Sequence, residues 1–219
     1  RDEIFLTTKI WISNAGSQRA KASIETSLKK LRTDYIDLML IHQPFGDYYG
    51  AYRAMEEAYR DGKLRAIGVS NFMPDRFIYI AGFMDIPPMV NQLETHVFQQ
   101  QRIARPVLSE FKTQLMAWSP LAQGNNGIFQ NNVLTKIGEK HGKTAAQVAL
   151  RFLIQSGIAA IPKAAHKNHI KENLDIFDFE LTSKEMKSIQ SLDLGRSQFI
   201  DHHASDVAKM FVSAGKAAS

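Results

Sequence analysis

Six short apolar or β-branched runs recur along the sequence, and each is separated from the next by a longer stretch with helical spacing. The runs cover residues 4–11, 35–42, 64–71, 89–94, 114–119 and 158–163. The run at 35–42 is almost wholly apolar, which is typical of a parallel strand covered on both faces. An amphipathic helix follows the first run, with an apolar stripe formed by Ala20, Ile24, Leu28 and Leu31. We expect a final helix over residues 183–192, with Ser183 as its capping residue. Strands that alternate with helices predict an α/β fold around a parallel sheet.

Two architectures are built from such units, a closed (β/α)8 TIM barrel and a doubly wound open sheet. An open sheet that binds a dinucleotide normally carries a G-x-G-x-x-G turn after an early strand, and this sequence contains none. We therefore favour the barrel, to which the chain supplies about six β/α units. No break in composition divides the chain, so we expect a single barrel domain over residues 1–219, with a C-terminal loop and tail from about residue 195.

The length of the chain carries a further expectation. A complete barrel typically needs about 250 residues, whereas this sequence has 219 and begins with Arg instead of Met. We therefore expect that the N-terminal strands of the barrel are missing from it.

Composition excludes several classes of function. Cysteine is absent, which excludes disulfides, thiolate metal sites and a cysteine nucleophile. The net charge of +5 is too small to indicate nucleic acid, and no basic helix supports that partner. No apolar run reaches the roughly 18–20 residues of a membrane span, and no signal peptide is visible, so we expect a cytoplasmic protein without a membrane partner. The pair His202 and His203 has no third ligand at suitable spacing, so we expect no metal site.

Polar or aromatic side chains stand at the end of every predicted strand. In chain order they are Lys9, His42, Ser70, Asn71, Gln92, Glu94, Trp118, Ser119 and Lys163. In a parallel barrel the chemistry lies at the C-terminal ends of the strands, so we expect these side chains to converge on one site. Each has a structural explanation as well: an exposed lysine, a hydrogen-bonded core histidine, or an amide that satisfies loop backbone.

Six motifs at these positions resemble the aldo-keto reductases. They are Thr8-Lys9, the stretch 34–44, the stretch 62–72, Asn91 to His96, Trp118 to Leu121, and Ile161 to Lys163 followed by Glu172-Asn173. They occur in the family's order and cover the chain to about Leu192. The tryptophan at 118, where many members carry tyrosine, resembles the bacterial diketogluconate-reductase-like branch. The resemblance implies an oxidoreductase that reduces aldehydes or ketones to alcohols by hydride transfer from NADPH, acting as a monomer or weak oligomer.

The resemblance also implies catalytic roles for Lys9 and His42. Lys9 matches a lysine whose ammonium favours the ionised form of a proton-donating tyrosine, and His42 matches a histidine that orients and polarises the substrate carbonyl. The aspartate and tyrosine that complete this site in the family would precede Lys9, and no matching residues stand there in this sequence. A second hypothesis therefore stays open, a barrel that binds nicotinamide nucleotide without turnover, as a sensor or scaffold.

The cofactor that the resemblance implies is NADP(H). The matching positions are Ser70, Asn71 and Gln92 at the nicotinamide carboxamide, Trp118 at the ring, Ser119, Leu121 and Gln123 at the pyrophosphate, and Lys163, His169, Glu172 and Asn173 at the 2'-phosphate and adenine. Two positions depart from the family pattern. His169 stands where an arginine is usual, and Ala164 follows Lys163 where a serine is usual.

Aromatic residues on the loops after the first two strands are candidates for a substrate pocket. Trp11, Phe45 and Tyr48 would line it and favour an apolar or aromatic small-molecule carbonyl compound. The alternative is that they are aromatic residues of surface loops.

Overall fold

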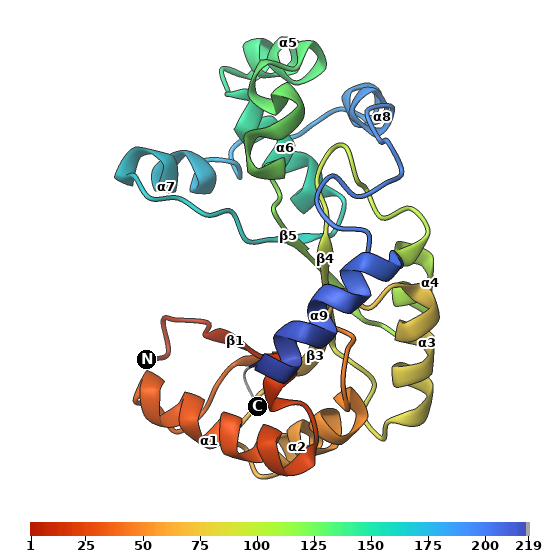
Figure 1. Ribbon diagram of the computed structural model, residues 1–219. Helices are drawn as coiled ribbons and strands as arrows, with labels where there is room; N and C mark the ends of the chain where they lie inside the picture. Colours follow the sequence, from red (N-terminus) through yellow and green to blue (C-terminus); the bar gives the residue numbers. More distant parts are fainter. Residues whose placement is uncertain (218–219) are drawn as a thin grey trace. The chain divides into compact units, whose positions relative to one another are not determined.

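The computed structural model describes residues 1–217 as six strands and the helices around them (Figure 1). The strands are β1 (Thr7–Ile10), β2 (Leu38–Ile41), β3 (Ile67–Ser70), β4 (Val90–Glu94), β5 (Gln114–Trp118) and β6 (Ala159–Ala160). The helices are η1 (Ile12–Asn14), α1 (Ser17–Leu31), α2 (Tyr48–Arg60), α3 (Pro74–Phe83), α4 (Ala104–Glu110), η2 (Ala122–Gln130), α5 (Asn132–His141), α6 (Ala145–Gln155), α7 (Lys167–Leu174), α8 (Ser183–Gln190) and α9 (Ser205–Ala217).

The strand order in the sheet is β1-β2-β3-β4-β5-β6, the same as the order in the sequence. The pairs β1–β2, β2–β3, β3–β4 and β5–β6 are parallel. A doubly wound sheet reverses its strand order at a switch point, and this sheet does not. The topology therefore confirms the prediction of a barrel-type α/β fold with six β/α units.

Each strand lies inside its predicted run but is shorter than it. At the ends of β3 and β5 the backbone leaves the extended conformation. After β3, Asn71 has a φ of 65°, and after β5, Ser119 has a φ of 49°. Both values lie in the left-handed region, which cannot continue a strand. The turn thus begins within the polar motif at each of these two strand ends.

Contacts between Cα atoms divide the chain into two compact units. The first comprises Arg1–Gln92, Pro106–Gln114 and the residues from Ile200 onward, and the second comprises Leu93–Arg105 and Leu115–Phe199. The single domain expected over residues 1–219 stays a prediction, and its positions 218–219 lie outside the described residues. We describe each unit by itself.

In the first unit, α1 and α2 lie side by side and pack on β1 and β2 (Figure 1). The predicted stripe of α1 buries Ala20, Ile24 and Leu28, whereas Leu31, in the last turn, is 42% exposed. Gly68 lies in β3 between two neighbouring strands, where an added Cβ would come within 2.3 Å of the Val90 carbonyl oxygen. Only glycine permits this close packing of backbone.

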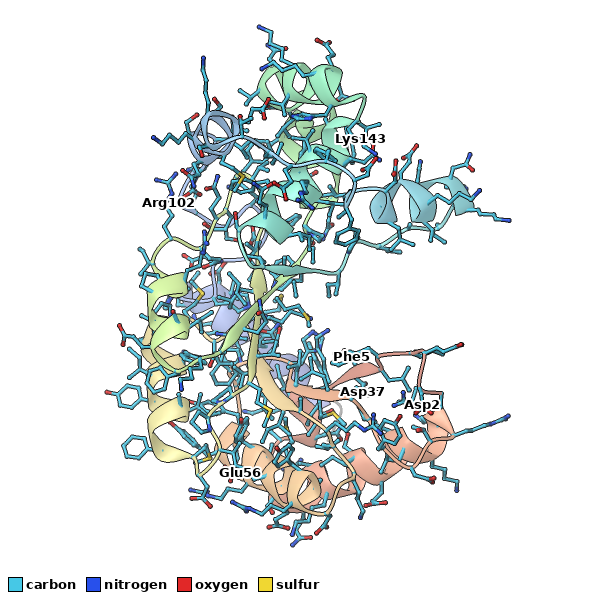
Figure 2. All side chains as sticks on the ribbon, turned by 180° about the vertical axis from the view of Figure 1, so that it is seen from behind. Asp2, Phe5, Asp37, Glu56, Arg102 and Lys143 are labelled. Atoms are coloured by element: carbon cyan, nitrogen blue, oxygen red, sulfur yellow. The ribbon has the colours of Figure 1, made fainter. Side chains whose placement is uncertain are left out.

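The buried carboxylate of Asp37 holds the start of the chain in the first unit (Figure 2). It accepts hydrogen bonds from the Leu6 N–H at 2.8 Å and from the Arg1 guanidinium at 2.7 Å. Burial alone would raise the pKa of Asp37, but these donors and the charge of Arg65 hold that pKa below its usual value. The segment that leads into β1 is therefore fixed by a side chain just before β2.

In the second unit, most residues of α6 are buried, and Val148, Ala149 and Phe152 are at most 1% exposed. Thr144 caps α6 in a capping box with Gln147. For α8 we predicted Ser183 as the capping residue, and this is wrong. Thr182 is the cap, because its hydroxyl accepts from the Glu185 N–H while Glu185 binds the Thr182 N–H.

No helix within residues 1–217 is both long enough and apolar enough to cross a membrane.

Candidate functional site

The register of two neighbouring strands in the first unit determines the positions of the two predicted catalytic residues, Lys9 and His42. Lys9 in β1 pairs with Leu40 of β2, and Ile10 pairs with Ile41. The N–H of His42 donates to the Ile10 carbonyl at 3.0 Å, which continues the ladder by one residue. Lys9 and His42 thus stand at the same end of two adjacent strands, as predicted for a site at the C-terminal ends.

Burial changes the ionisation of both residues. It lowers the pKa of His42 to about 4, and the positive charge of Lys9 lowers it further in the same direction. Burial also lowers the pKa of Lys9, and its ammonium forms no ion pair with another of the described residues. The imidazole of His42 is therefore neutral at pH 7 and can donate one N–H to an acceptor such as a carbonyl oxygen.

Ser70, Asn71 and Gln92 form a buried polar cluster at the ends of β3 and β4, with exposed fractions of 1%, 6% and 2%. The Ser70 hydroxyl donates to the Gln92 carbonyl at 3.0 Å, and the Asn71 N–H donates to the same carbonyl at 2.9 Å. The Asn71 amide donates to the His42 carbonyl at 3.2 Å. The structure thus brings together three predicted carboxamide-binding residues and ties them to the backbone of His42.

Two of the three predicted pocket aromatics lie beside this cluster. The Trp11 ring contacts the His42 ring edge-on, with centroids 4.8 Å apart. Phe45 is stacked on Phe211 of α9 at 5.0 Å, and Phe211 also contacts Trp11 at 6.3 Å. Tyr48 instead contacts Tyr49 and Phe72, so its ring belongs to the first turn of α2.

Phe211 and Gln43 also belong to this region, although the sequence did not indicate them. Phe211 is 5% exposed and joins Trp11 to Phe45, and its ring is also stacked against His202 at 6.0 Å. His202 in turn pairs with the Gln43 side chain at 3.0 Å. The only sequence signal was the helical pattern of the tail, which gives no information about the surface that α9 contacts.

The predicted cofactor residues of the second unit line two adjoining cavities. One cavity, of about 540 Å³, is lined by Ser119, Pro120, Leu121, Gln123, Gly124, Phe129, Ile161, Pro162 and Lys163. The other, of about 380 Å³, is lined by Leu121, Phe129, Thr144, Ala145, Ala146, Lys163, His169, Glu172 and Asn173. Leu121, Phe129 and Lys163 line both. Seven of the residues predicted from the sequence therefore border one continuous region of this unit.

The geometry of these lining residues suits an elongated anionic ligand. The Gln123 amide donates to the Ser119 hydroxyl at 3.0 Å, which closes the turn after β5. Lys163 supplies a cation where the two cavities meet. His169, at the position where the family pattern has arginine, contacts His166 edge-on with centroids 5.6 Å apart. Trp118, at the end of β5, lines neither cavity and instead contacts Phe199 at 5.5 Å.

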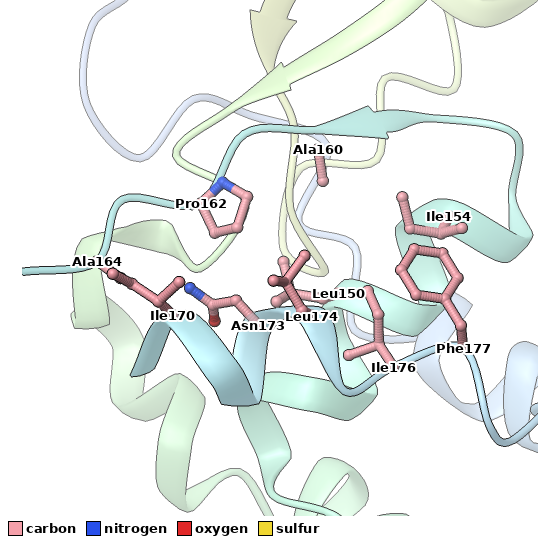
Figure 3. Close-up of a pocket in the computed structure, with 10 residues that line it drawn as sticks. All are labelled: Leu150, Ile154, Ala160, Pro162, Ala164, Ile170, Asn173, Leu174, Ile176 and Phe177. Atoms are coloured by element: carbon pink, nitrogen blue, oxygen red, sulfur yellow. The ribbon is translucent and has the colours of Figure 1, made fainter. Parts of the chain in front are cut away.

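A third cavity of about 380 Å³ lies beside α7 (Figure 3). It is lined almost wholly by apolar side chains from α6, from α7 and from the segments before and after α7, including Leu150, Ile170, Leu174 and Phe177. Ala164, the second departure from the family pattern, borders it as well. Asn173 is its only lining side chain with an amide, and this residue also borders the second cavity.

Within residues 1–217, no group of three or more His, Asp or Glu side chains is placed to hold a metal ion. His202 and His203 therefore have no third ligand among the described residues.

Comparison with known proteins gives a consistent result. Residues 1–194 match the model of the aldo/keto reductase family. The chain is 45% identical over 194 residues to glyoxal reductase of Bacillus subtilis, an alignment that covers 88% of this chain and 70% of that relative. It is also similar to the crystal structure of an aldo-keto reductase from a Medee basin deep-sea metagenome library, with a TM-score of 0.91 and 41% identity, covering 94% of this chain and 77% of the other.

A third match is the crystal structure of a Bombyx mori aldo-keto reductase in complex with NADP. The TM-score is 0.85 at 32% identity, and the match covers 92% of this chain and 71% of that one. The motifs, the in-order parallel sheet and these matches agree over most of the sequence. The chain therefore belongs to the aldo/keto reductase family, whose members share its barrel fold.

Proposed function

We propose that this chain reduces aldehydes or ketones to alcohols by hydride transfer from NADPH. The observation that carries the proposal is the neutral imidazole of His42 beside Lys9, at two adjacent strand ends and next to the buried cluster of Ser70, Asn71 and Gln92. A neutral imidazole carries one N–H, which it can donate to a carbonyl oxygen.

The cofactor assignment rests on the fit between the site residues and a dinucleotide. Ser70, Asn71 and Gln92 would hold the nicotinamide carboxamide, and Lys163 would bind the 2'-phosphate by a charge-assisted hydrogen bond. The adjoining cavities of about 540 and 380 Å³, lined by Ser119 to Gln123 and by His169 to Asn173, would receive the pyrophosphate and the adenine. When bound, the reduced nicotinamide supplies the hydride. A relative crystallised with NADP supports this choice of cofactor.

The residues of this chain would act on the substrate in two ways. His42 would orient the carbonyl by donating a hydrogen bond to its oxygen, which withdraws electrons from the carbon that receives the hydride. Lys9 would place a positive charge close to that oxygen and stabilise the negative charge that develops on it. Its ammonium would also give the proton that turns the alkoxide into the alcohol, and would regain it from water. Trp11 and Phe45 would contact the rest of the substrate.

We propose small aldehydes and dicarbonyl compounds as substrates. The aromatic groups Trp11 and Phe45 favour an apolar or planar molecule, and a relative at 45% identity is named glyoxal reductase. A cytoplasmic location and a monomeric or weakly oligomeric state belong to the same proposal, and size-exclusion chromatography of the purified chain tests the latter.

The second candidate function is binding of nicotinamide nucleotide without turnover. One observation favours it: among the described residues, no tyrosine hydroxyl is hydrogen-bonded to Lys9 or His42. A site without such a phenol lacks the proton donor on which reductases of this family depend. On this hypothesis, binding of NADPH quenches the fluorescence of the chain, but NADPH is not oxidised.

Steady-state oxidation of NADPH by the purified chain, with nitrobenzaldehyde or glyoxal as acceptor, separates the two candidates. We expect turnover by the unaltered chain and a loss of kcat/KM on the order of a hundredfold in His42→Ala. The control is His203→Ala, because His203 is an exposed histidine of the same unit with no role in the proposed site. Binding of NADPH without turnover above background would contradict the reductase and support the binding protein.

A further inference from the structure

A buried carboxylate outside the proposed catalytic group holds the chain near Trp118. Glu94 ends β4 and is 5% exposed. Its Oε2 atom accepts from the Ser197 hydroxyl at 2.5 Å, and its Oε1 atom accepts from the Gln198 N–H at 2.7 Å. A buried carboxylate is stable only when its oxygens are hydrogen-bonded. Here, two of the donors come from a segment about a hundred residues later in the sequence.

His96 supplies the third donor, and its tautomer follows from the backbone. Its Nδ1 atom accepts from the Phe98 N–H at 3.2 Å. The proton of the neutral ring must then lie on Nε2, which is 3.0 Å from Glu94 Oε1. His96 is fully buried. Because His96 binds Oε1 of Glu94, the Oε2 atom accepts from the Ser197 hydroxyl.

The segment 196–199 is held at further points of the second unit. The Asn126 amide, in η2, donates to the Gln198 side-chain oxygen at 2.9 Å. Just upstream, the Leu194 N–H donates to the Phe98 carbonyl at 2.9 Å, and Asp193 accepts from the Gln100 N–H at 3.1 Å. The segment therefore runs along the loop after β4 and is fixed before and after Ser197.

These contacts place the ring of Phe199. The Ser197 oxygen donates to Glu94 and also accepts from the Phe199 N–H at 3.1 Å, so it connects the carboxylate to the backbone of Phe199. The Phe199 ring lies 5.5 Å from the Trp118 ring with the planes tilted by 49°, and 6.2 Å from the His96 ring. Aromatic pairs at this separation attract one another and restrict rotation of the side chains.

We propose that Glu94 and Ser197 are positioning residues that hold Phe199 against Trp118, and that Phe199 thereby fixes the orientation of the Trp118 ring for stacking on the nicotinamide. The stacking role of Trp118 is the one that the family resemblance implies, and it rests on the proposed binding of NADPH. The family match ends at residue 194, so Ser197 and Phe199 lie beyond it. A ring held in its binding orientation lowers the entropic cost of taking up the cofactor.

Fluorescence of Trp118 tests this inference directly. The chain has two tryptophans, so Trp11→Phe leaves Trp118 as the only reporter. In that background we expect Phe199→Leu and Ser197→Ala to shift the emission of Trp118 to longer wavelength and to increase its quenching by acrylamide. The dissociation constant for NADPH should rise by about three- to tenfold in Phe199→Leu, in line with the usual strength of an aromatic pair. Phe199→Tyr, which keeps the ring, should restore both properties.

Matched controls in the same unit are Phe177→Leu and Ser191→Ala. Phe177 is 65% exposed and borders the apolar cavity of Figure 3, and the Ser191 hydroxyl only donates to the Ser188 carbonyl. Neither should change the emission of Trp118 or the affinity for NADPH.

Each possible result supports the inference or contradicts a stated part of it. An unchanged emission spectrum and quenching in Phe199→Leu overturn it, whatever the affinity for NADPH. A changed spectrum with unchanged affinity overturns the part that concerns the cofactor. An unaltered chain that does not bind NADPH contradicts the proposed function, and the emission of Trp118 then decides whether Phe199 positions its ring.

Discussion

The predicted cofactor residues of the first unit are buried and bound to neighbouring backbone, whereas half of the predicted site residues of the second unit are exposed. Ser70, Asn71 and Gln92 are at most 6% exposed, and their hydrogen bonds run to the carbonyls of adjacent strand ends. In contrast, Lys163, His169 and Glu172 are exposed, and α7 has no buried residue among those described. The first group is positioned by the sheet itself, and the second by a surface helix and loops.

This difference predicts where substitutions affect folding and where they affect only binding. A parallel sheet holds its strand ends through the ladder, so a change there disturbs both the fold and the site. A helix with exposed side chains can lose a ligand contact at little cost in stability. The following predictions test that distinction, from the largest expected effect to the smallest.

Gly68→Val should have the largest effect, on the free energy of unfolding. The added side chain would meet the Val90 carbonyl and the Leu40 side chain, and we expect a loss of about 3 kcal/mol or failure to fold. Urea unfolding followed by circular dichroism measures it. The control is Gly82→Ala in α3, where an added Cβ meets nothing within 4 Å, and which should be neutral or slightly stabilising. Equal unfolding midpoints for the two variants would contradict the role given to the sheet.

Asn71→Ala and Asn173→Ala make the same substitution at one predicted site residue of the first unit and at one of the second. In Asn71→Ala, the lost hydrogen bonds and the left-handed backbone should reduce the free energy of unfolding by about 2 kcal/mol and weaken NADPH binding at least about tenfold. Asn173→Ala should change stability by less than about 0.5 kcal/mol and weaken binding only a few-fold. Thermal unfolding and titration with NADPH give both numbers. A similar loss of stability in the two variants would remove the distinction.

Lys163→Ala tests an exposed site residue of the second unit, by comparing the binding of NADPH with that of NADH. The loss of one charge-assisted hydrogen bond should weaken NADPH binding about tenfold and leave NADH binding nearly unchanged. Calorimetric titration with each nucleotide measures the difference. Equal weakening for both nucleotides would show that Lys163 does not contact the 2'-phosphate.

At neutral pH, the ionisation of His42 has the smallest effect on stability in this series. Its pKa is about 4 in the folded chain against an ordinary value of 6.5, because burial disfavours the charged ring. The unfolded chain therefore binds more protons between these two values, so stability should fall as the pH decreases through this window and be unaffected by His42 above it. A proton NMR titration, with His42→Asn to assign the resonance, should give a midpoint near 4. A midpoint near 6.5 would show that the imidazole is solvated.

The strand–helix alternation was sufficient to predict an α/β fold with a parallel sheet, and the family motifs indicated the barrel. All six strands lie within predicted runs, because runs such as 35–42 are apolar enough to indicate buried parallel strands. The positions of Lys9 and His42 followed from the rule that chemistry gathers at C-terminal strand ends, and the motifs identified the family. Their roles in catalysis and cofactor binding stay predictions.

What the sequence did not indicate depends on contacts between distant residues. The stacking of Phe211 on Phe45 and the pairing of Glu94 with Ser197 join residues more than a hundred positions apart, and no local pattern encodes such a pair. The burial of Glu94 was not visible either, since a glutamate at a strand end is ordinarily exposed. The cap of α8 was misassigned by one residue because Thr182 and Ser183 are both good capping residues.

The transfer of label from NADPH deuterated at C4 to an aldehyde tests the central claim most directly. The purified chain is mixed with the labelled cofactor in excess over protein and with nitrobenzaldehyde, and the alcohol is analysed by mass spectrometry and NMR. The proposed function predicts one deuterium on the carbinol carbon, formed at a rate that His42→Ala reduces strongly. Saturating binding of NADPH with no labelled alcohol would contradict it.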